Sequence, residues 1–363
     1  MTSQNEGPKP GVARSLAELH ALGIMKRMPA ALSLSSTEPI ALPAIQAPSL
    51  EGLSVARTAP APISEHDLVE RFDVLRRKHA DRRERLAGED VGPDDEVLLD
   101  VLGFANGRLI PFSAREGWRA EVVPEPLLPG FFEALVGAKV GSSLGIELKL
   151  PDTYVVESLR GATARFLLEV RASSELKLLA DDSPELLKRL GAGTLIDVMR
   201  QLNDTLTHER AVEAEQLTQA RVLDEVVART QVTLSAALVD EELRHRWVET
   251  ERPILVRKAL QPDELQEALE GWLRDPLFRA DAERRLVLAL ALRAIAARDG
   301  VKLTKPAVDA LVGDLASLSG VPREDVVRAL KEDAALAKRL EDLALHLATL
   351  DSLMRRVALT PPV

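Results

Sequence analysis

Aromatic side chains gather in one stretch of this chain, from Glu96 to Val170. The sequence has 3 Trp, 1 Tyr and 7 Phe. Most of these rings lie inside the stretch: Phe104, Phe112, Trp118, Phe131, Phe132, Tyr154 and Phe166. Rings gathered in this way either fill a small core or line a pocket that needs flat apolar walls. Composition alone favours the core, and it leaves the pocket open.

Chemistry by acids, bases, nucleophiles or metals finds no support in the sequence. No Cys is present, which excludes disulfides, thiolate chemistry and Cys-based zinc sites. Phosphate-binding glycine loops, dinucleotide-binding glycine runs and the GxSxG turn are also missing, so hydrolase, kinase and dehydrogenase functions are not supported. We expect neither a metal nor a cofactor. None of the six His residues belongs to a pair with metal-ligand spacing, and we expect each at the surface or at a helix cap: His20, His66, His79, His208, His245 and His346.

The overall composition is that of a globular protein with a charged surface. The chain has 363 residues, 46% of them hydrophobic and 29% charged, which is enough for two or three domains. The formal net charge of −10 argues against a general nucleic-acid binder. No basic segment followed by an apolar run opens the sequence, and no window approaches eighteen uninterrupted apolar residues. We therefore expect a cytoplasmic protein that binds neither nucleic acid nor membrane.

The elements before the aromatic stretch are predicted to be a disordered start, a short helix, a linker and a second helix. Residues 1–11 are polar, and the spacing of apolar residues predicts a helix over 12–28. Residues 29–63 are rich in Pro, Ala and Ser and favour an extended linker or edge strand. Ser64 is a predicted N-cap, and its helix should run on to about Leu86. We interpret its Arg-rich end as a solvated face.

The aromatic stretch is the only part of the sequence that shows strand periodicity. Val97, Leu99 and Val101 alternate with polar or outward-facing neighbours, and later segments repeat this alternation. Asn106-Gly107 predicts a hairpin turn, because both residues accept positive φ. A short helix is expected just after Gly130. The prediction is an antiparallel sheet with one buried face, which makes a small α+β domain.

From Ser183 onward the pattern is helical throughout. A helix is expected to start at Ser183-Pro184, where a cap residue precedes a proline. A long helical stretch follows, and then helices over 236–258, 262–275, 277–298, 304–317, 323–333 and 335–358. Carboxylates on these helices are expected to pair with nearby Lys and Arg at the surface. The fold class is α+β, with a small antiparallel sheet domain joined to a larger all-α domain of long helices.

Turn motifs between residues 127 and 170 carry a specific resemblance. They are Leu128-Pro129-Gly130-Phe131, Leu135-Val136-Gly137 with Gly141, Pro151 to Tyr154, Leu159-Arg160-Gly161, and Phe166. In this order and spacing they resemble the FKBP-type peptidyl-prolyl isomerase domain, in particular the one in bacterial trigger factor. Similarity to trigger factor extends more weakly over about residues 50–363. Ser235 stands where that family usually has a proline.

The resemblance implies a division of the chain into four parts. These are an N-terminal extension (1–48), a linker with a connecting helix (49–92), an FKBP-like isomerase domain (93–175) and a helical chaperone-like domain (183–360). Trigger factors dock on the ribosome through a longer N-terminal domain with a Gly-Phe-Arg-x-Gly-Lys signature. That signature is absent here. We therefore expect a relative without the usual ribosome-docking domain.

The resemblance also implies a site for X–Pro isomerisation. When the catalytic residues of the FKBP-type family are transferred to this sequence, they are Phe131, Tyr154, Trp118 and Leu128. Phe131 would form the floor, the Leu128 N–H would hold a substrate carbonyl, and the Tyr154 hydroxyl would close the rim. Three further residues would bind substrate: Val101, Ile110 and Phe166. Val101 replaces an aromatic residue, and Pro111 replaces an acidic one, so we expect a cleft that is present but weakened.

Two functions remain open at this point. In the first, the protein is a folding factor that binds unfolded or nascent polypeptides and catalyses X–Pro isomerisation, even if weakly. In the second, the same scaffold is a non-catalytic module, or a dedicated chaperone, that holds one specific protein partner. Core filling by the same rings is compatible with the second function.

Overall fold

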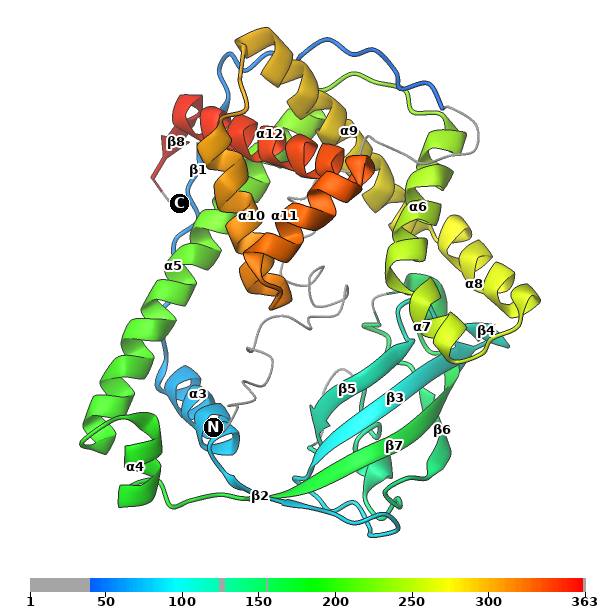
Figure 1. Cartoon of the computed structure of the whole chain (residues 1–363), viewed down its shortest axis with the longest axis vertical. Helices are drawn as coiled ribbons and strands as arrows, with labels where there is room; N and C mark the ends of the chain where they lie inside the picture. Colours follow the sequence, from blue (N-terminus) through cyan, green and yellow to red (C-terminus); the bar gives the residue numbers. More distant parts are fainter. Residues whose placement is uncertain (1–39, 124–127, 155, 362–363) are drawn as a thin grey trace. The chain divides into compact units, whose positions relative to one another are not determined.

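The computed structural model describes residues 40–123, 128–154 and 156–361. The helix predicted over 12–28 lies outside these residues. The chain forms two compact units. Of the described residues, the sheet unit comprises those within 60–213 and 249–272, and the helical unit comprises 40–59, 214–248 and 273–361. Figure 1 shows the elements of both, and the α+β fold class predicted from the sequence is confirmed.

The sheet unit is built on an antiparallel sheet, which has six strands among the described residues. Strands β2, β7, β3 and β4 follow one another across it, β5 pairs with β3, and β6 pairs with β7. Their bounds are β2 Asp81–Glu84, β3 Glu96–Ala105, β4 Arg108–Leu109, β5 Arg115–Glu121, β6 Ser143–Lys149 and β7 Thr163–Lys177. The small antiparallel sheet predicted from the sequence is therefore present.

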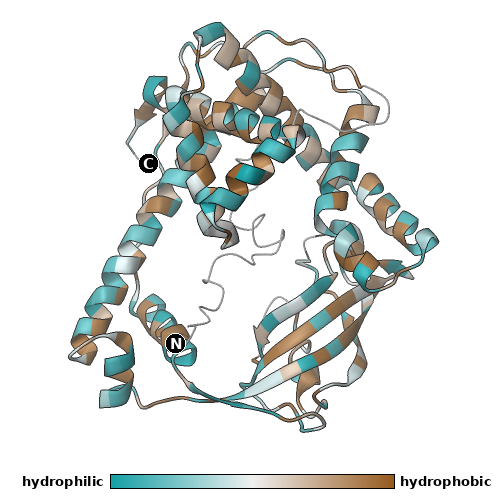
Figure 2. Cartoon of the chain, viewed as in Figure 1, coloured by the Kyte–Doolittle hydropathy of each residue, from teal (hydrophilic) through white to brown (hydrophobic). Residues whose placement is uncertain are grey.

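Alternation of side chains places the sheet's core on one face. In β3, Val97, Leu99 and Val101 are buried, and Figure 2 shows hydrophobic residues following the middle of this strand. In β7 every second residue from Ala164 to Val170 is buried. The turn between β3 and β4 uses Asn106 and Gly107 at φ values of 54° and 78°. The predicted hairpin turn is confirmed.

The Arg-rich segment after Ser64 is shorter as a helix than predicted. Ser64 caps helix α3 (Glu65–Lys78) through a reciprocal pair of hydrogen bonds with Asp67, as expected for a capping box. The helix ends at Lys78, and the arginines that follow lie on strand β2, which pairs with the far end of β7. Arg83 pairs with Glu175 across these strands at 2.8 Å. The residues of β2 are exposed, so the solvated face is as expected, but it belongs to a strand and not to a helix.

Helices and short turns complete the sheet unit. The predicted helix after Gly130 is only a single 3₁₀ turn, η1 (Glu133–Leu135), and a second turn, η2 (Glu157–Leu159), precedes β7. Helix α4 (Pro184–Leu190) begins at the cap Ser183, as predicted. It packs with α3 and with the start of α5 (Leu195–Ala228) around Phe72, Leu186 and Leu202. Helices α7 (Arg252–Arg257) and α8 (Pro262–Arg274) are the remaining members.

The helical unit is organised around α9 (Pro276–Asp299), which is buried along most of its length. The other helices are α6 (Ala236–Thr250), α10 (Lys305–Ser319), α11 (Arg323–Glu332) and α12 (Ala334–Arg356). Strand β1 (Ser54–Ala56) pairs in parallel with β8 (Ala358–Thr360). β1 lies in the segment expected to be an extended linker or edge strand, but the expectation of no strand after Ser183 is wrong, because β8 forms only through a pairing with this distant segment.

Two surface predictions are also wrong. His346, expected at the surface, is 5% exposed on α12. Burial lowers its pKa to about 4, although the negative charge of Asp342 acts in the opposite direction and raises the pKa. Within the helix predicted over 236–258, Glu242 and Glu251 are buried rather than solvated, and Asp95 and Asp100 are buried in the sheet unit. No helix of the described chain is long and apolar enough to cross a membrane.

Candidate functional site

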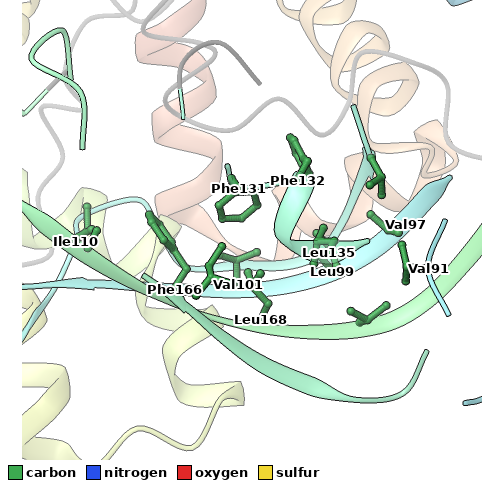
Figure 3. Close-up of a cluster of buried hydrophobic side chains, with 14 of the residues drawn as sticks. Val91, Val97, Leu99, Val101, Ile110, Phe131, Phe132, Leu135, Phe166 and Leu168 are labelled. Atoms are coloured by element: carbon green, nitrogen blue, oxygen red, sulfur yellow. The ribbon is translucent and has the colours of Figure 1, made fainter. Parts of the chain in front are cut away.

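The predicted site residues come together in one hydrophobic cluster of the sheet unit. Four of them are buried in it: Val101, Ile110, Phe131 and Phe166. The other three are half-buried against it: Trp118, Leu128 and Tyr154. In Figure 3, Phe131 faces the strands that carry Val101 and Phe166. The structure thus places all seven residues together, and their role in binding a prolyl peptide stays a prediction.

Phe131 is at the centre of the ring contacts. Its ring meets the Phe166 ring edge-on, with centroids 5.3 Å apart and planes at 87°. The Trp118 ring lies 6.0 Å away and is tilted by 49°. Phe132, which the resemblance did not assign to the site, lies 5.1 Å from Phe131 and 5.5 Å from Trp118. Rings at these separations have the offset or edge-on geometry that aromatic pairs favour, so they hold Phe131 in one orientation.

Tyr154 lies at the edge of the cluster, on the turn after β6. Its N–H donates to the Pro151 carbonyl at 2.9 Å, and its own carbonyl accepts from Arg160 Nε at 2.9 Å. Burial raises the pKa of the Tyr154 hydroxyl, and the nearby charge of Arg115 opposes this shift. The hydroxyl therefore stays protonated near neutral pH and can donate a hydrogen bond.

The turn that carries Phe131 is closed by a hydrogen bond between its own backbone groups. The Phe131 N–H donates to the Leu128 carbonyl at 3.2 Å. Phe132 and Glu133 follow, and the 3₁₀ turn η1 places Leu135 in the core at 0% exposure. This turn fixes the positions of Leu128 and Phe131 relative to each other, although the segment 124–127 before it lies outside the described residues.

A β-bulge in β5 changes which side chains face the cluster. Leu99 pairs with Trp118, but Val101 pairs with Arg115, so β5 carries one extra residue at this point. Gly117 has a φ of 61°, and its N–H donates to Asp100 Oδ1 at 2.7 Å. Positive φ at the glycine permits the bulge, and the buried carboxylate of Asp100 holds it. Sequence alternation missed this, although a lone glycine within a strand is a known sign of a bulge.

Asp100 is a buried junction between the sheet and α7. Its side chain is 2% exposed and pairs with both Arg171 and Lys258. Burial raises the pKa of this carboxyl, but the hydrogen bonds from Lys258 and from the Gly117 N–H outweigh it and leave the pKa below its usual range. The carboxylate is therefore charged at neutral pH and ties β3, β5 and Lys258 together.

A second junction fixes the loop between β4 and β5. Phe112 has a φ of 61°, which is costly for a residue with a side chain. Its N–H donates to Glu251 Oε1 at 2.8 Å, and its ring lies 4.3 Å from that of Trp272. The Trp272 indole N–H donates to Glu251 Oε2 at 2.7 Å. Phe112, one of the rings in the aromatic stretch, therefore packs on α8 and not in the cluster around Phe131.

Nothing in the described part of the chain resembles a metal centre. No group of three or more His, Asp or Glu side chains there is placed to hold a metal ion. The site is instead a wall of rings with a protonated hydroxyl and an arginine at its edge. Such a site can bind an apolar, planar group and exclude water from it.

Comparison with known proteins identifies the relatives of this chain. Residues 194–355 match the family described as the C-terminus of bacterial trigger factor protein. The trigger factor of Actinobacillus pleuropneumoniae serotype 5b is 24% identical over 319 residues, which cover 88% of this chain and 70% of that protein. The chain is thus similar in sequence to bacterial trigger factors. The trigger factor of Novosphingobium aromaticivorans is 28% identical over 272 residues, 75% of this chain and 52% of that protein.

The chain is also similar to a solved structure. That structure is described by the words "Promiscuous Substrate Recognition in Folding and Assembly Activities of the Trigger Factor Chaperone". It covers 94% of this chain and 83% of its own, at 17% identity and a TM-score of 0.37. The relationship to trigger factors that the turn motifs suggested is thus carried by the sequence comparisons.

Proposed function

We propose that this chain is a protein-folding factor of the trigger factor type. It binds unfolded or nascent polypeptides and catalyses X–Pro isomerisation at the aromatic site. The observation that carries the proposal is the packing of Trp118 and Phe166 against Phe131, with the Tyr154 hydroxyl at the edge. The relationship to trigger factors supports the folding role.

The chemistry of this reaction suits a site without acids or bases. Rotation about an X–Pro bond breaks amide resonance, at a barrier of about 18–20 kcal/mol. The twisted amide has less charge separation than the planar one, so a dry aromatic surface favours it. Phe131 receives the proline ring, and the Leu128 N–H and the Tyr154 hydroxyl hold substrate carbonyls. Val101, Ile110 and Phe166 complete the apolar wall.

Activity is expected to be weak, for reasons visible at two positions. Val101 is 4% exposed and provides a smaller surface than an aromatic ring would. Pro111 carries no charge, whereas FKBP-type domains often have an acidic residue at the corresponding position. The Cγ atom of Pro111 lies 4.0 Å from the position that a Cβ atom on Gly271 would occupy. The proposal therefore combines slow isomerisation with peptide binding.

A proline-limited refolding assay tests the proposal with two adjacent variants. Phe131→Leu and Phe132→Leu remove the same atoms from neighbouring positions that are 3% and 5% exposed. Their costs in stability should be similar, about 1–3 kcal/mol each. We expect wild type to accelerate refolding and Phe131→Leu to lose most of the acceleration, whereas Phe132→Leu, which removes only a ring that supports Phe131, should lose less of it. Circular dichroism confirms that both variants are folded. Equal rates for wild type and the uncatalysed reaction would refute catalysis.

A second function is favoured by the burial of the side chains that would form the apolar wall of the site. Phe131, Phe166, Val101 and Ile110 are all at most 5% exposed, as they would be in a core that is merely filled. In that case the protein is a non-catalytic binding module or a chaperone dedicated to one partner. Suppression of aggregation of several unrelated unfolded proteins separates the two. Broad protection supports the folding factor, whereas protection of none, with one co-purifying partner, supports the module.

The proposal does not include ribosome docking, because the Gly-Phe-Arg-x-Gly-Lys signature does not occur in the sequence. A cytoplasmic location and the four-part division drawn from the resemblance remain predictions. Deletion of residues 1–48 tests whether that segment directs location or partner choice. An unchanged set of bound proteins after the deletion would refute such a role.

A further inference from the structure

Gly145 is a glycine that the fold of strand β6 does not require. It lies inside the strand, where a glycine weakens the sheet. Its φ is not positive, and the pairing of β6 with β7 continues through it without a bulge. A Cβ atom here would meet Arg165 Nε at 3.7 Å and Leu167 Cδ2 at 3.8 Å, which are ordinary contact distances. A strand glycine without a conformational or steric reason often marks a place where another backbone approaches closely.

The backbone of β6 has a free edge. Within the described sheet β6 pairs with β7 and with no other strand, and Figure 1 shows it beside β7. The Val170 N–H donates to the Ser142 carbonyl at 3.0 Å, and the Leu150 N–H donates to the Ala162 carbonyl at 2.9 Å. Because hydrogen-bonded and non-hydrogen-bonded pairs alternate in an antiparallel ladder, these bonds direct the even-numbered residues of β6 toward β7. The backbone groups that point away from β7 belong to Ser143, Gly145, Glu147 and Lys149.

A hollow of about 380 Å³ lies beside Gly145, and Leu102 and Leu167 also line it. Leu167 is 40% exposed, and it points away from the aromatic cluster because its two neighbours on β7 are buried. The missing side chain of Gly145 leaves Leu167 uncovered. An aromatic side chain on an added strand can cover an edge glycine of this kind. Here the ring would pack on Leu167 and on the Arg165 guanidinium.

The charges of the same face indicate what the occupant carries. Glu147 and Lys149 follow Gly145 at alternate positions and are exposed. Neither forms an ion pair within the described part of the chain. A complementary antiparallel strand has a basic residue opposite Glu147 and an acidic residue opposite Lys149. A second copy of β6 fits less well, because antiparallel copies centred on Gly145 would place glycine opposite glycine and leave the hollow unfilled.

We propose that the free edge of β6 binds an extended polypeptide segment, which adds as an antiparallel strand with an aromatic residue opposite Gly145. In strand addition of this kind, main-chain hydrogen bonds give affinity and alternate side chains give specificity. The inference rests on the proposed function only in that the occupant is a polypeptide. It does not require isomerisation, because the hollow lies on the face of the sheet opposite the aromatic cluster.

The probe is a fluorescein-labelled peptide with capped ends, Glu-Val-Lys-Val-Phe-Val-Thr, whose binding to the full chain is measured by fluorescence anisotropy. We expect a peptide with Ala in place of Phe to bind about tenfold more weakly. An N-methyl group on the Phe nitrogen removes an N–H that faces β6 and should abolish binding. N-methylation of the Val that follows Phe is the matched control, because that N–H faces away from β6.

Amide hydrogen exchange locates the bound peptide. Exchange of the Gly145 and Glu147 N–H groups should slow when the peptide binds, whereas the Ile146 N–H already faces β7 and should not change. Gly145→Val suits a strand and covers Leu167, so it should remove the preference for Phe over Ala. Phe131→Leu should leave the binding of this peptide unchanged.

The outcomes separate this inference from the proposed function. Equal binding of the Phe and Ala peptides, unchanged exchange at Gly145, or weaker binding by Phe131→Leu would each overturn it. Exchange at Gly145 that slows with rising protein concentration, without peptide, would overturn it in favour of a second copy. Peptide binding at β6 without acceleration of proline-limited refolding would refute catalysis and support the inference. Acceleration without such binding would refute the inference alone.

Discussion

Glu251 is expected to be the most sensitive single position for the loop between β4 and β5. It is 3% exposed and accepts hydrogen bonds from the Phe112 N–H at 2.8 Å and from the Trp272 indole at 2.7 Å. In Glu251→Gln the amide oxygen can accept only one of them, and the amide N–H₂ group meets the other donor. A hydrogen bond to a charged group contributes about 1.5–3 kcal/mol, so we expect a loss of about 2–3 kcal/mol.

Hydrogen exchange at Phe112 measures this loss locally. If the loop opens independently of the rest of the unit, 2–3 kcal/mol corresponds to exchange about 30- to 150-fold faster. The strained backbone of Phe112, at a φ of 61°, adds to the tendency to open. The readout is deuterium uptake in a peptide that spans this residue, at constant pH and temperature.

Glu267→Gln provides the matched control for this experiment. Glu267 also joins α8 to the sheet, through an ion pair with Arg108 at 3.2 Å, but the two side chains are 50% and 61% exposed. An exposed pair of this kind contributes at most about 1 kcal/mol. If Glu251→Gln and Glu267→Gln change Phe112 protection equally, the buried carboxylate does not hold the loop and the reasoning fails.

Two further predictions concern buried charged groups. Burial lowers the pKa of His346 to about 4, so the unfolded chain binds more protons between about pH 6.5 and pH 4, and stability falls as pH drops through this window. At pH 5 the loss relative to pH 7 is about 2 kcal/mol. His346→Leu should flatten this slope in urea unfolding, and an unchanged slope would contradict the assignment. Asp95 is 2% exposed and pairs with Arg85 while accepting from Ser173 Oγ at 2.7 Å. Asp95→Asn should lower the free energy of unfolding by about 3 kcal/mol, and a loss under 1 kcal/mol would show that the pair is replaceable.

Local patterns in the sequence predicted the sheet well. Period-two alternation identified the buried face of β3 and β7, and Asn106-Gly107 identified the turn between β3 and β4. Ser64 and Ser183 were recognised as caps because their signal lies within a few residues. These features depend on short-range chemistry, which a sequence displays directly.

Features that depend on distant partners escaped prediction. The segment 81–84 reads as the end of a charged helix, and it is a strand only because β7 extends far enough to pair with it. The burial of Asp100 requires Lys258, which is far away in sequence. Arg115 reaches the site only through a bulge that Asp100 holds. In each case the deciding interaction joins residues whose proximity no local pattern indicates.

The pairing of β1 with β8 has a consequence for how this protein is made. Ser54 lies opposite Ala358, so the two strands are separated by about 300 residues of chain. Contacts between segments so far apart form slowly and late, because a long loop must close before they contribute. During synthesis the strands of the sheet unit emerge together and can pair early, whereas β1 can pair only after the roughly 300 residues up to β8 have been made. A protein proposed to assist the folding of others thus leaves one of its own strands unpaired while most of the sheet unit is already complete.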